Sequence, residues 1–300
     1  MAHVRIDGGV RQRAKVTRFL TPPLLCVLCI LCVLRDDAAA QIEVGVAAEA
    51  QRDRFTYHFD NPSSADTPFL VPHFFEQRYV ADNVWLSGAV RYVAGIRWET
   101  TAGVTPQRTS TGDDYDTFFN PDGTVIVSGT TGGISIRSFR FSQRAEFARA
   151  GPVTLVAGYR LRVDRSDFQL GHKTVTRNNV IVTAIDVTTR EFTSSQLHEV
   201  LVGGTMRRDV TPAWTLSFDG EIAPTTVGRL LVQLPDKYPD EDLVFLAKVA
   251  AATGRLALTR RTGRWTVELS VDAGKTWSYR SEASLARQTL GARIRAGRAW

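Results

Sequence analysis

The chain has 300 residues with 37 basic and 31 acidic side chains, a formal net charge of +6 at pH 7. Residues 41–300 retain 31 basic and 28 acidic side chains, and this near balance argues against nucleic acid as a partner. All three cysteines lie before residue 33, so residues 41–300 have no thiol for a disulfide, a nucleophile or a metal site.

The first forty residues predict a secretory signal peptide. A basic leader precedes the apolar run Phe19–Leu34, and Ala38 and Ala40 form an A-x-A arrangement just before the predicted cleavage site. The run is shorter than the roughly 20 residues that a spanning helix needs. An uncleaved N-terminal anchor is the alternative. We therefore expect residues 1–40 to be a signal peptide and residues 41–300 to be the mature domain.

Beyond residue 40, many segments alternate apolar and polar residues with the two-residue period of a β-strand. In the segment 153–164, Val153, Leu155 and Leu161 fall on one face, and Arg160 falls on the other. We predict about ten strands, a number of the kind seen in bacterial barrels. Their predicted ranges are 42–59, 72–80, 84–104, 133–148, 153–168, 192–208, 213–226, 243–260, 264–280 and 284–299.

The predicted connections alternate in length, as periplasmic turns alternate with extracellular loops in outer-membrane barrels. The tight connections are 81–83, 149–152, 209–213 and 261–264, with a further short one near Ser281. The longer connections are 60–71, 105–132, 169–191 and 227–242. The strands 133–148 and 243–260 change the phase of their alternation, and a β-bulge in each is one explanation.

A soluble sandwich and a membrane barrel both alternate in this way. The clean strands run longer than the five or six residues usual in a sandwich. Trp98, Trp214, Trp265 and Trp277 lie near strand ends, where interfacial aromatic girdles occur. The predicted fold class is therefore all-β, a ten-stranded antiparallel transmembrane β-barrel, located in the outer membrane of a Gram-negative bacterium.

A ten-stranded barrel is narrow, because interiors near eight strands are filled by side chains and open channels appear near sixteen. Charged residues on the polar faces of the strands are therefore expected to form a packed, mutually neutralising network. The alternative is a selective conduit. The residues concerned are Arg91, Arg97, Arg160, Arg162, Asp219, Glu221, Glu268 and Asp272.

Three stretches resemble the omptin family of outer-membrane proteases. They are "FFEQRYVADNVWLSGAVRY" (74–92) followed by "IRWETTAG" (96–103) and the acidic "DDYD", then "IRSFRFSQRAEFARAGPVTLVAGYRLRVDRSDFQ" (136–169), then 243–280. The resemblance covers most of residues 41–300. It implies a ten-stranded barrel with a proteolytic site at its extracellular rim, where two aspartates of the second loop face an Asp–His pair of the fourth loop. In such a site the imidazole accepts a proton from the attacking water.

The first half of this apparatus can be matched. Asp114 and Asp116 correspond best to the family's aspartate pair, and Asp113 is an alternative partner. The second half cannot, because the fourth loop, 228–242, contains no histidine. His172 on the third long loop is the best substitute base by topology, and a solvated loop histidine is the alternative. No histidine has the spacing of a metal site, and no cofactor is expected.

The missing histidine favours an omptin-like barrel that acts as a non-catalytic surface-binding or envelope-structural protein. The alternatives are a divergent endopeptidase that uses Asp114 and Asp116 to activate water, and a narrow porin-like conduit. The resemblance also implies contacts with lipopolysaccharide, since omptins bind it through outward basic residues. Candidates are Arg137, Arg140 and Arg144, whose inward orientation is the alternative. The expected partners are outer-membrane lipid, including lipopolysaccharide, and a peptide or protein at the extracellular rim.

Overall fold

The computed structural model describes residues 42–61, 73–188, 190–233, 235, 242–279 and 283–300. The predicted signal peptide, residues 1–40, lies outside these described residues. Within them, no helix has the length and hydropathy needed to cross a membrane.

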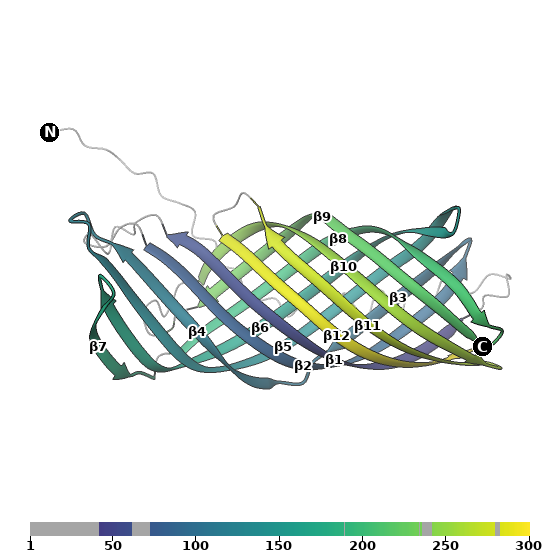
Figure 1. Ribbon diagram of the computed structural model, residues 1–300, viewed down its shortest axis with the longest axis horizontal. Coiled ribbons are helices and arrows are strands. Elements are labelled where there is room, and N and C mark those ends of the chain that lie inside the picture. The colour runs from purple at the N-terminus through teal and green to yellow at the C-terminus, as the bar shows by residue number, and fades with distance from the viewer. Residues whose placement is uncertain (1–41, 62–72, 189, 234, 236–241, 280–282) are drawn as a thin grey trace. The chain divides into compact units, whose positions relative to one another are not determined.

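The described strands belong to one antiparallel sheet (Figure 1). Long alternating segments pair with their neighbours in the chain, as expected of a β-meander. The strands are β1 (Glu43–Asn61), β2 (His73–Ala94), β3 (Ile96–Val104), β4 (Arg108–Phe119), β5 (Val125–Ala150), β6 (Val153–Arg177), β7 (Val180–Asp186), β8 (Arg190–Thr211), β9 (Trp214–Gln233), β10 (Asp242–Thr262), β11 (Trp265–Ser278) and β12 (Ala283–Ala299).

The sheet closes into a barrel with a wall of ten strands. The first and last strands pair along their length, from Glu43 opposite Ala299 to Phe59 opposite Ala283. β3 and β4 are two parts of one wall strand, because both lie between β2 and β5. Among the described strands β7 pairs with β6 alone, and it projects with β6 as a hairpin (Figure 1). The predicted ten-stranded antiparallel barrel is confirmed.

The two ends of the barrel differ in their connections. At one end, which we call the turn end, tight turns at Gly95, Gly151 and Gly263 have positive φ angles of 71°, 58° and 57°. Glycine adopts this left-handed conformation without steric penalty. Both ends of the described chain meet there, since the Trp300 amide donates to the Ile42 carbonyl at 2.9 Å. The opposite end, where β4 meets β5 and the β6–β7 hairpin projects, is the loop end.

The predicted turn at 81–83 is wrong, because β2 runs through these residues and ends at Ala94. The predicted strands 72–80 and 84–104 are therefore misdivided. Asn83 donates from Nδ2 to Asp53 Oδ2 at 2.8 Å in the interior. Asp82 faces outward, with Oδ1 at 3.7 Å from Nε of Arg52. Each of these polar residues has a partner on β1, so the strand continues.

The predicted loops 105–132 and 169–191 are also too long. The first contains β4 and the start of β5, joined by a short turn at 120–124. The second contains the end of β6 and the whole of β7, joined by Asn178 and Asn179 with φ angles of 48° and 66°. Positive φ at both central residues is the mark of a type I′ hairpin turn, which asparagine tolerates.

The interior has two layers, and the one toward the loop end is mainly apolar. It fills the bore with aromatic and aliphatic side chains, which we call the apolar cluster. The layer toward the turn end is lined by charged side chains. The apolar cluster consists of Phe55, Tyr57, Phe75, Tyr79, Ala81, Ile134, Ile136, Phe168, Leu197, Leu230, Val232, Ala247, Val249 and Leu285.

The outer face shows the opposite order along the barrel. On β1 the outward residues Val44 and Val46, toward the turn end, are followed by the exposed Arg52 and Arg54. An apolar belt thus surrounds the charged layer of the interior. Its exposed members include Val44, Val46, Leu86, Val104, Phe147, Val200, Val202, Met206, Leu216, Phe218, Ile222, Leu256, Val267, Leu269, Val271, Leu290 and Ile294.

This reversal explains the phase change within β5. The inward positions continue without a break from Ile134 and Ile136 to Arg140, while Phe139 faces outward. The predicted bulge between Ile136 and Phe139 is therefore absent, and the register of β5 shifts elsewhere, at 131/132 and 146/148. The apparent change of phase arises because the apolar residues of β5 face inward in the loop-end layer and outward in the turn-end layer.

The β-bulge predicted for the strand 243–260 lies in the adjacent strand β9 and not in β10. The register between β9 and β10 shifts where Val249 and Ala251 meet β9, which has one extra residue at 224–225. Pro224 has no backbone N–H to donate, so a bulge accommodates it without loss of a hydrogen bond.

Candidate functional site

The predicted aspartate pair lies in a strand rather than a loop. Asp114 and Asp116 belong to β4, paired in register with Gln77 and Phe75 of β2. Both side chains face the interior near the loop end and are buried, with exposed fractions of 3% and 6%. Asp113 faces outward and accepts a hydrogen bond from Thr131 Oγ1 at 2.9 Å. Strand alternation therefore selects Asp114 and Asp116 as the pair that shares a face.

A polar network from three other strands lies at the same level. The Tyr57 hydroxyl donates to Gln77 Oε1 at 2.6 Å, and the Thr193 hydroxyl lies 2.8 Å from the Tyr57 hydroxyl. Gln77 Nε2 donates to Glu191 Oε2 at 3.5 Å. Glu191 is 3% exposed, so a third carboxylate is buried close to the aspartate pair. Sequence reasoning missed Tyr57, Gln77 and Glu191, whose inward alternation was the only available signal.

The network has a marked electrostatic character. Burial raises the pKa of Tyr57 well above its ordinary range, and the negative charge of Glu191 acts in the same direction. The phenol therefore stays protonated and serves as a hydrogen-bond donor at physiological pH. The arrangement can fix the side chains of β1, β2 and β8 relative to one another, and no histidine with a described side chain belongs to it.

The described histidine side chains lie outside this network. His172 is in register with Thr131, which bonds Asp113, so it occupies the outer face of the sheet. Its Nδ1 lies 3.0 Å from Asp186 Oδ1, and its side chain is 58% exposed. The structure therefore does not bring His172 together with Asp114 and Asp116, as the sequence-based assignment required. The sheet itself separates them.

The other two histidines with described side chains also face outward. His198 Nδ1 lies 2.7 Å from the Tyr159 hydroxyl on the outside of β6 and β8. His58 stacks on Phe74, with ring centroids 5.6 Å apart. Neither side chain faces the aspartate pair.

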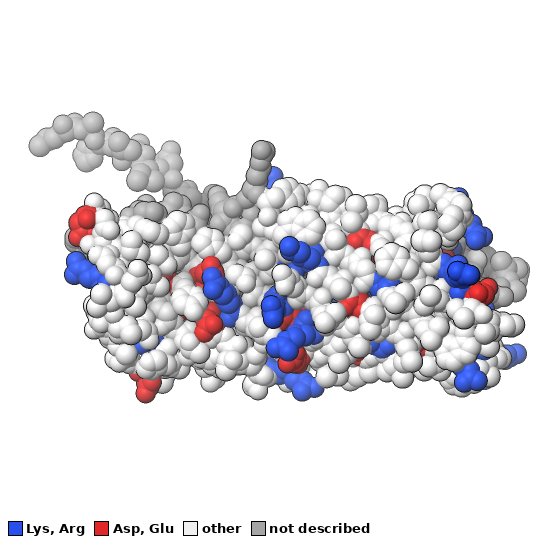
Figure 2. All heavy atoms as spheres, viewed as in Figure 1, with Lys and Arg blue, Asp and Glu red and all other residues white. Residues whose placement is uncertain are grey.

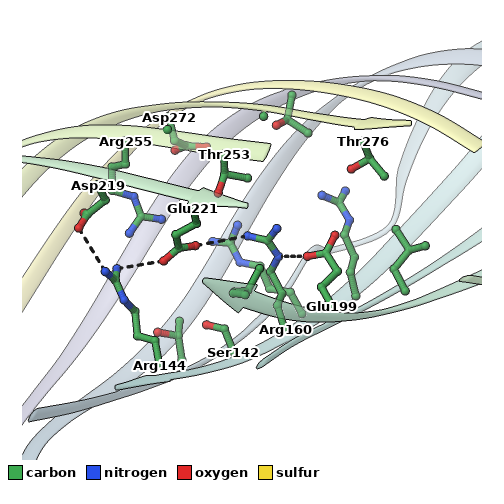
Figure 3. A pocket seen from close by; sticks show the side chains of 18 of the residues that line it. Ser142, Arg144, Arg160, Glu199, Asp219, Glu221, Thr253, Arg255, Asp272 and Thr276 are labelled. Atoms are coloured by element: carbon green, nitrogen blue, oxygen red, sulfur yellow. Dashed lines mark hydrogen bonds and ion pairs between the residues drawn. The ribbon is translucent and has the colours of Figure 1, made fainter. Parts of the chain in front are cut away.

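Charged residues of the turn-end layer form a chain of ion pairs (Figure 3). Arg144 Nη2 lies 3.2 Å from Asp219 Oδ1, and its Nη1 lies 3.5 Å from Glu221 Oε1. Arg160 Nη1 lies 3.9 Å from Glu221 Oε2, and Arg160 also pairs with Glu199. These residues line a cavity of about 150 Å³. The network predicted from the polar strand faces is confirmed for Arg160, Asp219 and Glu221.

Arg140 belongs to the same interior. It forms an ion pair with Glu49, and its guanidinium lies 4.5 Å from the centre of the Trp85 ring. The guanidinium of Arg162 lies 5.2 Å from the same ring. The assignment of Arg140 and Arg144 to lipid binding is therefore wrong, because both share the inward alternation of Ile134 and Ile136.

Arg137 is the one of the three predicted lipid-binding arginines that faces outward. It is exposed and lies in register opposite Arg165 of β6, which is also exposed. Similar basic residues follow the apolar belt on other strands, and charged side chains gather in the middle of the barrel in Figure 2. We call the exposed set Arg52, Arg137, Arg165, Arg229, Lys248 and Lys275 the basic collar.

A second hollow opens at the turn end. It has a volume of about 720 Å³ and is lined mainly by polar and charged side chains. Arg91 lies on its wall, within 3.5 Å of Glu43, Glu99 and Glu268. Among the described residues, no cluster of His, Cys, Asp and Glu is arranged to hold a metal ion.

The fold matches solved outer-membrane barrels, whereas no protein-family model and no curated protein sequence matches the chain. The outer membrane protease OmpT from Escherichia coli superposes with a TM-score of 0.58 at 9% identity, over 87% of this chain and 97% of that chain. Neisserial surface protein A gives 0.27 at 10% identity, over 86% and 99%. The translocator domain of the autotransporter NalP from Neisseria meningitidis gives 0.33 at 10%, over 92% and 94%. The first similarity shows an omptin-like outer-membrane β-barrel fold.

Proposed function

We propose that this protein is a surface-exposed barrel of the bacterial outer membrane that binds a ligand at its loop end and does not hydrolyse peptides. Its structural similarity to outer-membrane barrels supports the location. Proteins of one fold can differ in function, so function is argued from the site. The aspartate pair is the basis for the non-catalytic role, and the loop-end surface is the basis for ligand binding.

The layering of the barrel supports a position in the membrane. A spanning barrel wall needs an apolar outer face and can hold charges inside, whereas a barrel in water needs the reverse. The belt around the charged layer fits a bilayer, and the apolar cluster fits a part of the barrel that stands in water. Short turns then face the periplasm, and the loop end faces the cell exterior.

The single observation that carries the non-catalytic assignment is the setting of Asp114 and Asp116. Water activation requires a base within hydrogen-bond reach of the water, directly or through one further water. His58, His172 and His198 all lie on the outer face. The carboxylates are instead buried beside a polar network that includes Tyr57.

A binding role is supported by the β6–β7 hairpin. All seven residues of β7 are exposed, including Val180, Ile181 and Val182 at 65%, 65% and 56%. Contiguous exposed apolar residues mark interaction sites, and a strand edge can accept an extended peptide. The proposed ligand is therefore a peptide or protein segment at the cell surface.

A porin-like conduit has less support. Tyr57, Phe168 and Val232 of the apolar cluster are each no more than 1% exposed, so side chains occupy the bore above the charged layer. A planar-bilayer recording of the refolded protein should give a flat trace, and steady single-channel steps would contradict this proposal.

The basic collar supports lipopolysaccharide as the lipid partner. Arg137 and Arg165 are like charges directly opposite each other, which is unfavourable unless an anion bridges them. A lipid phosphate supplies that anion, and arginine binds phosphate through two parallel N–H groups.

The decisive experiment is a peptide-cleavage assay on the protein refolded with lipopolysaccharide, using varied basic peptides. Wild type and the variant Asp114→Ala/Asp116→Ala should both leave the peptides intact. The matched control is Asp113→Ala, which removes an outward carboxylate from the same strand. Cleavage by wild type and by Asp113→Ala, but not by the double variant, would establish the divergent endopeptidase instead.

The binding role needs its own test. A peptide library can be selected on the immobilised refolded barrel and on the variant Ile181→Lys/Ile185→Lys. Both substitutions lie on β7 and are exposed, so the barrel wall should fold unchanged. Enrichment on wild type that is lost on the variant is expected, whereas equal enrichment on both proteins would remove β7 from the proposal.

A further inference from the structure

Arginine and tryptophan alternate around the outer face of the turn end. Five consecutive strands, β8 to β12, contribute one residue each to what we call the arginine–tryptophan stripe: Arg208, Trp214, Arg260, Trp265 and Arg298. Trp214 lies in register with Arg260, and Trp265 lies in register with Arg298. Arg208 lies opposite Leu216, which shares the outward face of β9 with Trp214.

The rings and the guanidinium groups contact one another. The Arg260 guanidinium lies 5.5 Å from the centre of the Trp214 ring. The Arg298 guanidinium lies 5.5 Å from the Trp265 ring and 4.3 Å from that of Trp300. Stacking of this kind uses the flat face of the guanidinium and leaves N–H groups at its edge available to an acceptor. The contacts therefore orient the arginines without supplying hydrogen-bond acceptors for their guanidinium N–H groups.

The stripe has no acidic partner among the described residues. None of its three arginines forms an ion pair with a described carboxylate, in contrast to the arginines of the interior. The neighbouring Asp209 alternates to the inner face, where it accepts a hydrogen bond from Thr215 at 2.7 Å. Figure 2 shows basic side chains gathered at the end of the barrel where the C-terminus lies. Three positive charges on one outer face are thus left for an external anion.

The stripe borders the apolar belt. Leu216 and Val267, at 39% and 43% exposed, lie next to it on the side toward the loop end. If the belt lies in the bilayer, as the proposed function requires, the stripe lies at headgroup depth in the leaflet on the turn side. Tryptophan favours this interfacial depth, and arginine at this depth meets lipid phosphates.

We propose that the arginine–tryptophan stripe binds anionic phospholipid, with headgroup phosphates held between neighbouring guanidinium groups. A zwitterionic headgroup would add its own ammonium to three uncompensated arginines, whereas phosphatidylglycerol adds a net negative charge. The site is separate from the basic collar in position and in ligand, since the collar lies at the opposite edge of the belt.

The test compares two triple variants with equal loss of charge at the same end of the barrel. Arg208→Gln/Arg260→Gln/Arg298→Gln removes the cations of the stripe. Arg149→Gln/Arg261→Gln/Arg264→Gln removes three arginines that line the turn-end hollow instead. Lipid adducts are titrated by native mass spectrometry on the refolded protein, with phosphatidylglycerol and phosphatidylethanolamine of matched acyl chains.

Wild type should prefer phosphatidylglycerol, and the stripe variant should lose roughly 100-fold in apparent affinity for it, about fivefold for each arginine. The hollow variant should stay close to wild type. Equal phosphatidylglycerol binding by the stripe variant and wild type would overturn the inference. Complete displacement by millimolar inorganic phosphate would also overturn it, because the site would then recognise the free anion and not the lipid.

Folding and membrane insertion are measured separately. The heat-dependent shift in gel mobility reports the closed barrel in each variant, and Arg208→Lys/Arg260→Lys/Arg298→Lys keeps the charge should the glutamine variant fail to fold. The lysine variant should retain a preference for phosphatidylglycerol. Failure of wild type to insert into vesicles of either lipid would refute the membrane placement itself, whereas insertion without lipid preference would refute the stripe alone.

Discussion

Arg287 of β12 donates a hydrogen bond to Asp164 of β6 across the interior, although the two residues are 123 positions apart in the chain. Their side chains are only 4% and 6% exposed. Asp164 also accepts hydrogen bonds from Ser138 and Arg162, and the Arg287 guanidinium lies 4.9 Å from the Phe55 ring. The pair therefore joins the charged layer to the apolar cluster.

Substitution Asp164→Asn should destabilise the barrel by about 3–5 kcal/mol, because it leaves Arg287 and Arg162 buried without their shared carboxylate. Urea unfolding of the refolded protein measures the loss. The matched control is Asp82→Asn, which breaks a pair with Arg52 whose side chains are 76% and 61% exposed. That change should cost less than about 1 kcal/mol. Similar losses of stability in both variants would contradict the role of Asp164 as the shared, buried partner of Arg287 and Arg162.

Tryptophan fluorescence should distinguish the interior from the lipid-facing surface. Trp85 is fully buried in the interior between Arg140 and Arg162, whereas Trp265 is 55% exposed on the outer face. In variants that keep a single tryptophan, vesicles with brominated acyl chains should quench Trp265 and leave Trp85 unchanged. Quenching of Trp85 would show that its side chain faces lipid, and would contradict the assignment of inward and outward residues on β2.

The loop-end half should lose stability in alkali. Burial raises the pKa of Tyr57 and of Tyr79, and the charges of Glu191 and Asp164 reinforce the respective shifts. Each folded-state pKa lies above the unfolded value of about 10, so the stabilising contribution is complete below pH 10 and is lost as the pH rises beyond it.

Absorbance at 295 nm and unfolding midpoints, followed together from pH 9 upward, measure this effect. Tyr57 and Tyr79 should ionise together with unfolding and not before it. Replacement of Tyr57 by Phe should weaken the alkaline dependence while it removes the hydrogen bonds to Gln77 and Thr193. Reversible ionisation of every tyrosine in the folded barrel would show that the two phenols are accessible.

The orientation in the membrane can be tested with introduced cysteines, since residues 41–300 contain none. Val182→Cys lies on the exposed β7, and Arg264→Cys lies at the turn end. On intact cells a membrane-impermeant maleimide should label Val182→Cys and spare Arg264→Cys until the cells are broken. The opposite pattern would place the loop end in the periplasm.

Part of the candidate site was predictable. Asp114 and Asp116 were identified from the resemblance to the omptin aspartate pair, but the stretch around them has the polar composition of a loop. It forms β4 because β2 and β5 pair with it on both sides, and such pairing overrides local preference. Glu191 could not be predicted, because it reaches Gln77 from 114 residues away only after the barrel closes.

The sequence by itself determined long antiparallel strands joined by turns, because the two-residue period runs over long segments with turn residues between them. Only the tertiary structure decided which face of each strand is inside. Ile136 packs into the apolar cluster and Phe139 faces outward, although both belong to one unbroken strand. An apolar side chain can leave water by entering lipid or by entering a core, and alternation is the same in both cases.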